Sequence, residues 1–308
     1  MKFRPRRSVL YMPGSNARAI EKARTLPADC VILDLEDSVA PDAKAAARTQ
    51  VSQAVTAGGF GTREVVVRVN GLDTEWWHED LEMIASAKSE FSKAQSTKPQ
   101  AILVPKISRP DELKRVDQEL ANMRADPDIR VWAMMESPLA MLNARDIAAV
   151  AQNPQATQAR LAAFVMGTND LAKDTRARII PGRAPMLPWL MTCVAAARAY
   201  GIDIIDGVYN DLGNPAGFTE ECVQARDLGF DGKTLIHPNQ IEACNAVFAP
   251  NAEEVAQARK VIDAFERPEN KDRGVIALDG RMVERLHADM ARRTVAIADA
   301  IELMRAGP

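Results

Sequence analysis

The chain has 308 residues, of which 47% are hydrophobic and 26% charged, an ordinary composition for a folded protein. Its net charge of −3 gives no electrostatic support to nucleic-acid binding. No run of about 18 apolar residues occurs, which argues against a transmembrane helix. The apolar stretch 9–12 after the basic start is too short for a signal-peptide core, so we expect a cytoplasmic protein. The cysteines include no CxxC pair, so we expect reduced, buried thiols.

Short apolar runs recur along the chain, and a helical pattern follows each of them. The runs are nearly continuous in apolar character, which is typical of strands buried on both faces of a parallel sheet. The predicted strands are 8–13, 30–37, 64–70, 101–106, 130–136, 161–167, 202–207 and 232–238. The predicted helices are 17–25, 42–57, 75–89, 110–124, 139–151, 188–200, 215–228 and 239–248.

Eight strands in strict alternation with eight helices predict an α/β fold of the (β/α)₈ TIM-barrel type rather than an open doubly wound sheet. No GxGxxG motif follows the first strand, so the sequence does not support a dinucleotide site.

The composition changes after a ninth helical stretch at 252–265. Residues 266–274 are charged and rich in helix breakers, as in a linker. A short apolar piece at 275–278, a turn at Asp279-Gly280 and a helix over 282–305 follow. We therefore predict a barrel domain over 1–270 and a small C-terminal appendage over 271–308, which is too short to hold its own core and must pack on the barrel or on a neighbouring subunit.

Polar residues end most of the predicted strands. Active sites of such barrels lie at the C-terminal ends of the strands, so this pattern indicates a functional rim. The polar strand ends are 34–37, 68–70, 105–106, 135–136, 167–170, 206–207 and 237–238.

Glu136 and Asp170 end the fifth and sixth strands. Two carboxylates in one polar mouth repel each other unless a cation lies between them. Oxygen ligands without His or Cys favour Mg²⁺, or Mn²⁺, over zinc. The alternative is that each carboxylate caps a nearby helix, and the spacing alone leaves both interpretations open.

Arg68 is suited to bind a substrate carboxylate through two parallel hydrogen bonds. Alternatively, it pairs internally with Asp34 or Asp37. Glu36 and Asp37 could orient metal-bound water or Arg68, or transfer protons. Lys106 as a Schiff-base lysine would instead indicate a metal-free aldolase, which the acidic pair argues against.

Several ordered motifs resemble the citrate lyase β-subunit-like family of the HpcH/HpaI aldolase superfamily, which includes malyl-CoA and citramalyl-CoA lyases. Each motif is modest alone, but together they span nearly the whole predicted barrel in the expected order. They are RRSVLYMPG at 6–14, LDLEDSV at 33–39, RVN at 68–70, PK at 105–106, MESP at 135–138, GTNDL at 167–171, GK at 232–233 and IHP at 236–238 with Gln240.

The resemblance implies a TIM barrel in which Glu136 and Asp170 bind Mg²⁺ and Arg68 holds the substrate. It also implies that Tyr11, Arg18 and Lys22 lie near the phosphates or adenine of coenzyme A. Cations on the first helix suit a ligand that carries phosphate groups.

Residues 280–284 resemble the lid of the CoA-dependent lyases, which carries a catalytic Asp and covers the site of a neighbouring subunit. In this chain Glu284 stands at that position, one methylene longer, and Asp279 lies nearby. The resemblance implies a homo-oligomer, a trimer or hexamer.

The sequence thus predicts a Mg²⁺-dependent acyl-CoA lyase that cleaves or forms a carbon–carbon bond between an acyl-CoA (acetyl- or propionyl-CoA) and a 2-oxo acid. The alternatives are a citrate lyase β subunit acting on an acyl-carrier-protein thioester, a malyl-CoA thioesterase, and a non-catalytic CoA-binding protein. The predicted catalytic residues are Arg68, Glu36, Asp37 and Glu284.

Overall fold

The computed structural model describes residues 3–86, 98–152 and 159–306. Within them, eight parallel strands close into a barrel in sequence order, and β8 pairs with β1. The predicted (β/α)₈ fold is therefore confirmed. The barrel strands are β1 (Ser8–Pro13), β2 (Cys30–Asp34), β3 (Glu64–Arg68), β4 (Ala101–Val104), β5 (Arg130–Met135), β6 (Leu161–Met166), β7 (Asp203–Asp206) and β8 (Gly232–Leu235).

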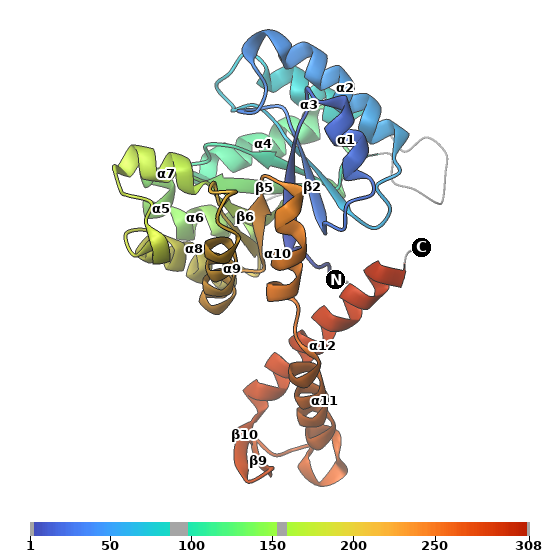
Figure 1. Ribbon diagram of the computed structural model, residues 1–308, viewed down its shortest axis with the longest axis vertical. Helices are drawn as coiled ribbons and strands as arrows, with labels where there is room; N and C mark the ends of the chain where they lie inside the picture. The colour runs from blue at the N-terminus through green and yellow to red at the C-terminus, as the bar shows by residue number, and fades with distance from the viewer. Residues whose placement is uncertain (1–2, 87–97, 153–158, 307–308) are drawn as a thin grey trace. The chain divides into compact units, whose positions relative to one another are not determined.

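Helices lie around the outside of this barrel (Figure 1). No helix in the described ranges has both the length and the apolar character needed to cross a membrane. The barrel helices are α1 (Ala17–Ala23), α2 (Lys44–Ala57), α3 (Trp77–Ser86), α4 (Pro110–Asn122), α5 (Pro138–Leu142), α6 (Ala144–Ala149), α7 (Thr168–Thr175), α8 (Leu187–Tyr200), α9 (Pro215–Leu228) and α10 (Ile241–Phe248).

The interior of the barrel is a packed apolar core. Side chains from alternate strand positions point inward and fill it, as expected when a barrel has eight strands. All four cysteines are buried, and no disulfide joins them, as predicted. The inward cluster contains Val9, Cys30, Ile32, Val66, Ala101, Leu103, Trp132, Met134, Ala163, Val165 and Ile205.

The strands after β1 end earlier than predicted, because the chain turns away from the barrel at its rim. Pairing continues for one residue beyond some strands: the Leu35 N–H donates to the Arg68 carbonyl at 2.9 Å, and the Gly167 N–H donates to the Met135 carbonyl at 3.1 Å. Asp34, Arg68 and Asp206 are the last residues of their strands, and the other polar residues predicted as strand ends lie in the loops and helix starts above the barrel.

Several helix predictions differ from the structure in their limits. The pattern at 139–151 is split at Asn143 into α5 and α6, and the last residues of the predicted 75–89 helix lie outside the described residues. The prediction missed α7, which begins directly after β6 and places Asp170 in its first turn.

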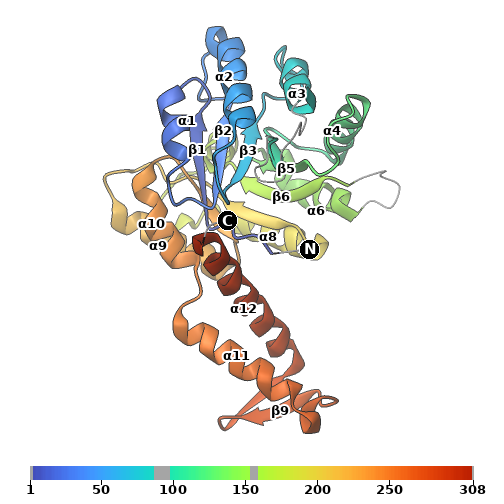
Figure 2. The same cartoon turned by 90° about the vertical axis from the view of Figure 1, so that its right-hand side faces the viewer.

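The chain divides into two compact units, residues 6–245 and the described parts of 1–5 and 246–308. We expected the boundary near residue 270. The second unit instead includes α11 (Ala252–Glu266), which packs along α12 (Arg285–Ala306) around a core of its own (Figure 2). Its buried members are Ala258, Val261, Ala264, Phe265, Ile276, Ala288 and Ala291.

The start of the last predicted helix was wrong, because residues 281–284 form a strand. β9 (Val275–Leu278) pairs antiparallel with β10 (Arg281–Glu284), and Asp279 and Gly280 form a two-residue loop with φ of 51° and 75°. An Asp-Gly pair with two positive φ angles is a strong hairpin signal. The turn was predicted, but the pairing that follows from it was not.

Candidate active site

A buried ion pair joins the C-terminal ends of β2 and β3. Arg68 donates from Nε to Asp34 Oδ1 at 2.6 Å and from Nη2 to Asp34 Oδ2 at 2.7 Å. Both side chains are buried, and the Arg68 guanidinium lies 4.9 Å from the centre of the Tyr11 ring. The internal pairing considered for Arg68 is therefore present, and its main partner is Asp34.

The Arg68 charge sets the protonation states around it. Burial raises the pKa of Asp34, but the Arg68 charge and the hydrogen bonds to Asp34 lower it more, and the net shift is downward. The remaining nitrogen, Nη1, lies 3.0 Å from Glu36 Oε2. Burial and the neighbouring Asp37 raise the pKa of Glu36 in spite of Arg68. Of the two carboxyls that contact Arg68 most closely, Glu36 therefore holds a proton more readily than Asp34.

Glu136 follows β5 and is buried against its neighbours. Its Oε1 accepts a hydrogen bond of 2.6 Å from the backbone N–H of Lys106, whose φ is 59°. On the other side, a Cβ on Gly167 would lie 2.3 Å from the Glu136 Cβ and 2.5 Å from its Oε2, so only glycine fits there. Burial, and then the charges of Asp170 and Glu36, raise the pKa of Glu136 to about 7.

Asp170 lies in the first turn of α7 and lines a cavity of about 340 Å³ at the rim of the barrel. Tyr11, Asp37 and Arg68 line the same cavity. The Asp170 charge acts on buried Glu136, so the ends of β5 and β6 contribute to one site. The rim therefore brings together the two carboxylates and the guanidinium that the sequence singled out.

This site suits a hard divalent cation that keeps open positions. A buried carboxyl whose pKa is raised by a second carboxylate is stabilised in its charged form by a cation. In the described residues, no group of three or more His, Cys, Asp or Glu side chains is arranged to hold a metal ion. Two carboxylates match Mg²⁺, which is usually bound through one or two of them and retains water or substrate oxygens. They do not match a structural zinc site.

The model of the HpcH/HpaI aldolase/citrate lyase family matches residues 7–238, which span all eight barrel strands. The chain belongs to this family. The resemblance found in the motifs is therefore confirmed, and the matched range contains Arg68, Glu136 and Asp170.

Relatives of known activity within the family differ in what they do. The chain is 48% identical to a (3S)-malyl-CoA thioesterase of Cereibacter sphaeroides (strain KD131) over 302 residues, 98% of each chain. It is 33% identical to the citrate lyase subunit beta of Escherichia coli (strain K12) over 303 residues, 97% of this chain and 95% of the relative. Family membership thus shows a citrate lyase-like enzyme and leaves the individual reaction open.

A solved structure is similar over nearly the whole chain. The CitE protein of Mycobacterium tuberculosis, in complex with magnesium, acetoacetate and coenzyme A, is 26% identical with a TM-score of 0.71. The similarity covers 96% of this chain and 98% of CitE. A citrate lyase from Burkholderia xenovorans, 20% identical with a TM-score of 0.80, supports the fold.

The residues predicted to lie near coenzyme A occupy different positions. Tyr11 lines the rim cavity beneath Arg68. Arg18 and Lys22 lie on the exposed face of α1 and are not among the residues that line the cavity. The structure thus brings Tyr11 to the site and leaves Arg18 and Lys22 on the outer surface.

Lys106 has two contacts at the rim. Besides the backbone bond to Glu136, its Nζ lies 3.3 Å from Glu36 Oε1. Burial lowers the pKa of this ammonium, but Glu36 raises it more, and the net shift is upward. A Schiff-base lysine needs a depressed pKa, so this environment does not suit that role.

Glu284 and Asp279 belong to the C-terminal unit, so their predicted action at the barrel stays a prediction. The Glu284 backbone N–H donates to His287 Nδ1 at 2.9 Å, and Asp279 Oδ2 accepts from Lys260 Nζ at 2.5 Å. The Asp279 carboxylate is therefore engaged within its own unit.

Sequence reasoning missed a second buried ion network beside the site. Lys233 Nζ donates to Asp206 Oδ2 at 2.8 Å and to Glu221 Oε1 at 2.6 Å, and Arg183 Nη1 lies 2.8 Å from both Asp206 oxygens. Burial raises the pKa of Asp206, but the two cations lower it more. The signal was available, because a lysine inside the apolar run of β8 has to be paired.

Proposed function

We propose that this chain is a Mg²⁺-dependent enzyme that acts on hydroxyacyl-CoA thioesters of the malyl-CoA type. The observation that carries the proposal is the convergence of Arg68, Glu136 and Asp170 on one rim beside a cavity of about 340 Å³. Glu136 and Asp170 would hold the ion. When bound, Mg²⁺ supplies positive charge that stabilises anionic substrate oxygens.

Arg68 would orient the carboxylate end of the substrate. Asp34 occupies Nε and Nη2 and so fixes the plane of the guanidinium. Nη1 faces Glu36 at 3.0 Å and is the nitrogen for which an incoming carboxylate competes. A guanidinium held on one side by a carboxylate loses little side-chain freedom when a ligand binds on the other side.

Glu36 would transfer a proton at the hydroxyl end of the substrate. Its raised pKa lets it hold a proton closer to neutral pH than an exposed carboxyl does, and efficient acid–base catalysts have a pKa near the working pH. Asp37 contributes to this shift and would serve as its partner.

Coenzyme A would lie along the first βα unit. Tyr11 lines the cavity, and Arg18 and Lys22 supply exposed positive charge on the helix that follows β1. Two cations that no anionic side chain neutralises in the described residues suit the phosphates of coenzyme A.

Thioester hydrolysis is the first candidate reaction, because a (3S)-malyl-CoA thioesterase is 48% identical over 98% of the chain. In hydrolysis, water adds to the thioester carbonyl, the carbon–sulfur bond breaks, and coenzyme A leaves as the thiol. Carbon–carbon cleavage is the second candidate, favoured by the family match and the citrate lyase relatives.

Product analysis separates the two candidates. Incubation with malyl-CoA and Mg²⁺ releases free thiol and malate if the thioester is hydrolysed. It gives acetyl-CoA and glyoxylate without free thiol if the carbon–carbon bond is cleaved. Citramalyl-CoA serves as a second substrate. Turnover that persists unchanged with excess chelator would contradict the proposal.

The C-terminal unit would act as a lid in a homo-oligomer, with Glu284 as its acidic group. A mixture of two inactive proteins, Arg68→Met and Glu284→Gln, tests this arrangement. If the lid acts on a neighbouring subunit, mixed oligomers regain part of the activity. If each subunit uses its own lid, mixing restores none.

A further inference from the structure

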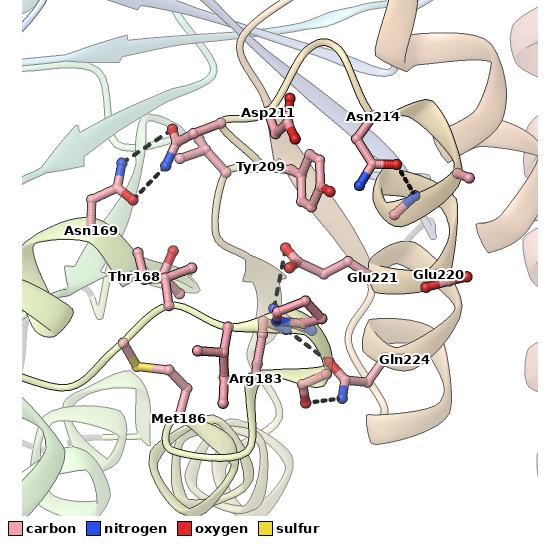
Figure 3. Close-up of a pocket in the computed structure, with 18 residues that line it drawn as sticks. Thr168, Asn169, Arg183, Met186, Tyr209, Asp211, Asn214, Glu220, Glu221 and Gln224 are labelled. Atoms are coloured by element: carbon pink, nitrogen blue, oxygen red, sulfur yellow. Dashed lines mark hydrogen bonds and ion pairs between the residues drawn. The ribbon is translucent and has the colours of Figure 1, made fainter.

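A second cavity adjoins the candidate site and has no part in the function proposed so far. Its volume is about 590 Å³, and it lies between the loops that follow β6 and β7 and the start of α9 (Figure 3). Four residues line both cavities, so the two share a wall. These are Thr168, Asn169, Val208 and Asn210.

The shared wall carries a pair of amide side chains. Asn210 Nδ2 donates to Asn169 Oδ1 at 2.8 Å, and Asn169 Nδ2 donates to Asn210 Oδ1 at 3.4 Å (Figure 3). Both side chains are exposed, so these bonds compete with water and contribute little to stability. Asn169 directly precedes Asp170, which places the wall at the end of the site proposed to hold the ion and the hydroxy acid.

One side of the second cavity is aliphatic. This side is lined by Ile179, Ile180, Met186 and Val208. Ile179 is 55% exposed and is not part of the barrel core. An exposed isoleucine at the edge of a cavity provides apolar surface that a ligand can cover.

The opposite side carries more carboxylates than cations. Arg183 lines the cavity but is only 4% exposed. Its Nη1 pairs with Asp206 and Glu221, which Lys233 also contacts, and its Nη2 has no hydrogen-bond partner in the described residues. Asp211 and Glu220 also line the cavity, and no cation pairs with either within residues 3–86, 98–152 and 159–306. The cavity therefore offers a negative mouth and aliphatic walls, which suit neither coenzyme A nor a second carboxylate.

We propose that this cavity is an annex of the active site that takes an uncharged alkyl substituent on the hydroxyl-bearing carbon of the substrate. The inference rests on the proposed function, in which Asp170 would help hold the ion that binds the oxygens of the hydroxy acid. The substrate class is then branched or lengthened malyl-CoA analogues, and substituents that end in a carboxylate are rejected. The Asn169–Asn210 pair opens to admit the substituent.

Ligand binding tests the annex without catalysis. Calorimetry on the Mg²⁺-loaded protein compares glyoxylate, pyruvate, 2-oxobutyrate and 2-oxovalerate, which differ by single methylenes. Each added methylene buried in the annex tightens binding by about fourfold. Oxaloacetate replaces the terminal methyl of 2-oxobutyrate with a carboxylate, and we expect it to bind at least about tenfold more weakly than 2-oxobutyrate.

A matched pair of variants identifies the cavity responsible. Ala216 lines the annex and is exposed, whereas Leu212, on the preceding loop, is exposed and is not among the residues that line it. Ala216→Trp places a large side chain in the annex, so the affinity should no longer rise with the length of the 2-oxo acid. The affinity for glyoxylate should stay within about twofold of the wild-type value. Leu212→Trp should keep that gain.

The outcomes also separate this inference from the function on which it rests. If glyoxylate binds in a Mg²⁺-dependent manner but affinity does not rise with the length of the 2-oxo acid, only the annex proposal is overturned. The same holds if affinity still rises with chain length in Ala216→Trp. If none of the acids binds in a Mg²⁺-dependent manner, the proposed function fails and the annex with it.

Discussion

The two ends of the barrel each contain a largely buried arginine bound by carboxylates, yet the two sites differ in kind. At the N-terminal end, Arg6 pairs with Glu64 at 2.7 and 2.8 Å and with Asp203 at 2.5 Å, and its guanidinium lies 4.8 Å from the centre of the Trp132 ring. At the C-terminal end, Arg68 makes the corresponding pair with Asp34.

The two ends differ in how many carboxylates have no cation in contact with them. Glu64 and Asp203 both contact Arg6 directly, so this group of charges serves stability. At the C-terminal rim the acidic side chains outnumber the cations Arg68 and Lys106, and one of them, Glu136, titrates near neutrality. Carboxylates that no cation contacts at one end of a barrel indicate a cation site, whereas carboxylates that all bind one buried arginine indicate structure. The rim carboxyls are Asp34, Glu36, Asp37, Glu136 and Asp170.

The strongest test of this contrast is Glu136→Gln, which keeps the shape and removes the charge. We expect a loss of Mg²⁺-dependent turnover of at least about a thousandfold, because a ligand of the ion is lost. At about pH 5, where wild-type Glu136 is protonated, the folded variant should keep the wild-type Tm in the absence of metal. Initial rates with and without Mg²⁺ and thermal melts check both statements. A variant with normal Mg²⁺-dependent rates would remove Glu136 from the site.

The converse change is Glu64→Gln at the other end. It breaks the two-point contact with Arg6 inside the barrel, and we expect a loss of about 3 kcal/mol in the free energy of unfolding. Denaturant unfolding measures this loss. The turnover of the folded fraction should stay within about twofold. If Glu64→Gln instead reduces turnover in fully folded protein, the division between a structural and a functional end is wrong.

The protonation of Glu136 predicts how stability depends on pH. Its pKa of about 7 in the fold lies above the value for an unfolded chain, so the native state binds the extra proton between those two values. This contribution to stability is present at acid pH and is lost as the pH rises to about 7. In the absence of metal, the free energy of unfolding of Glu136→Gln should therefore rise relative to that of the wild type between pH 5 and 7, by up to ~3 kcal/mol. Above pH 7 the difference between the two proteins should stay constant. Parallel pH profiles in urea unfolding would contradict the raised pKa.

Gly167 tests the space around Glu136. A methyl group there would lie 2.3 Å from the Glu136 Cβ, so Gly167→Ala must displace the carboxylate. We expect the apparent affinity for Mg²⁺ to fall by roughly a hundredfold, since a misplaced group commonly costs that much. Gly274→Ala is the control, because its new Cβ meets no atom of the described residues within 4 Å. If Mg²⁺ titrations gave the same apparent affinity for both variants, Gly167 would not position Glu136.

The smallest effect is expected on the outer face of α1. Arg18→Gln with Lys22→Gln should raise the KM for a CoA thioester by roughly fivefold to tenfold at low salt, with kcat unchanged. The effect should shrink as salt screens the phosphates. Lys114→Gln, a neutralisation on α4 that removes a pair with Asp111, is the control. A KM that does not change in the double variant places the phosphates elsewhere.

Local pattern was sufficient to predict the barrel. Most of its strands begin at the predicted residue, because apolar runs between turn residues are a short-range signal. The family motifs also identify Arg68, Glu136 and Asp170 as candidate site residues from the sequence alone. The error at 281–284 arose from a competition that local propensity does not resolve, since hairpin pairing with β9 overrides the helical pattern.

The sequence by itself determined the order of the strands and the residue types at their ends. Only the tertiary structure decided that Arg68 pairs with Asp34, that the Lys106 backbone bonds Glu136, and that Gly167 leaves room for it. The physical reason is distance along the chain. Periodicity reports neighbours within a few residues, whereas these contacts join strands that are about 30 residues apart and meet only when the barrel closes.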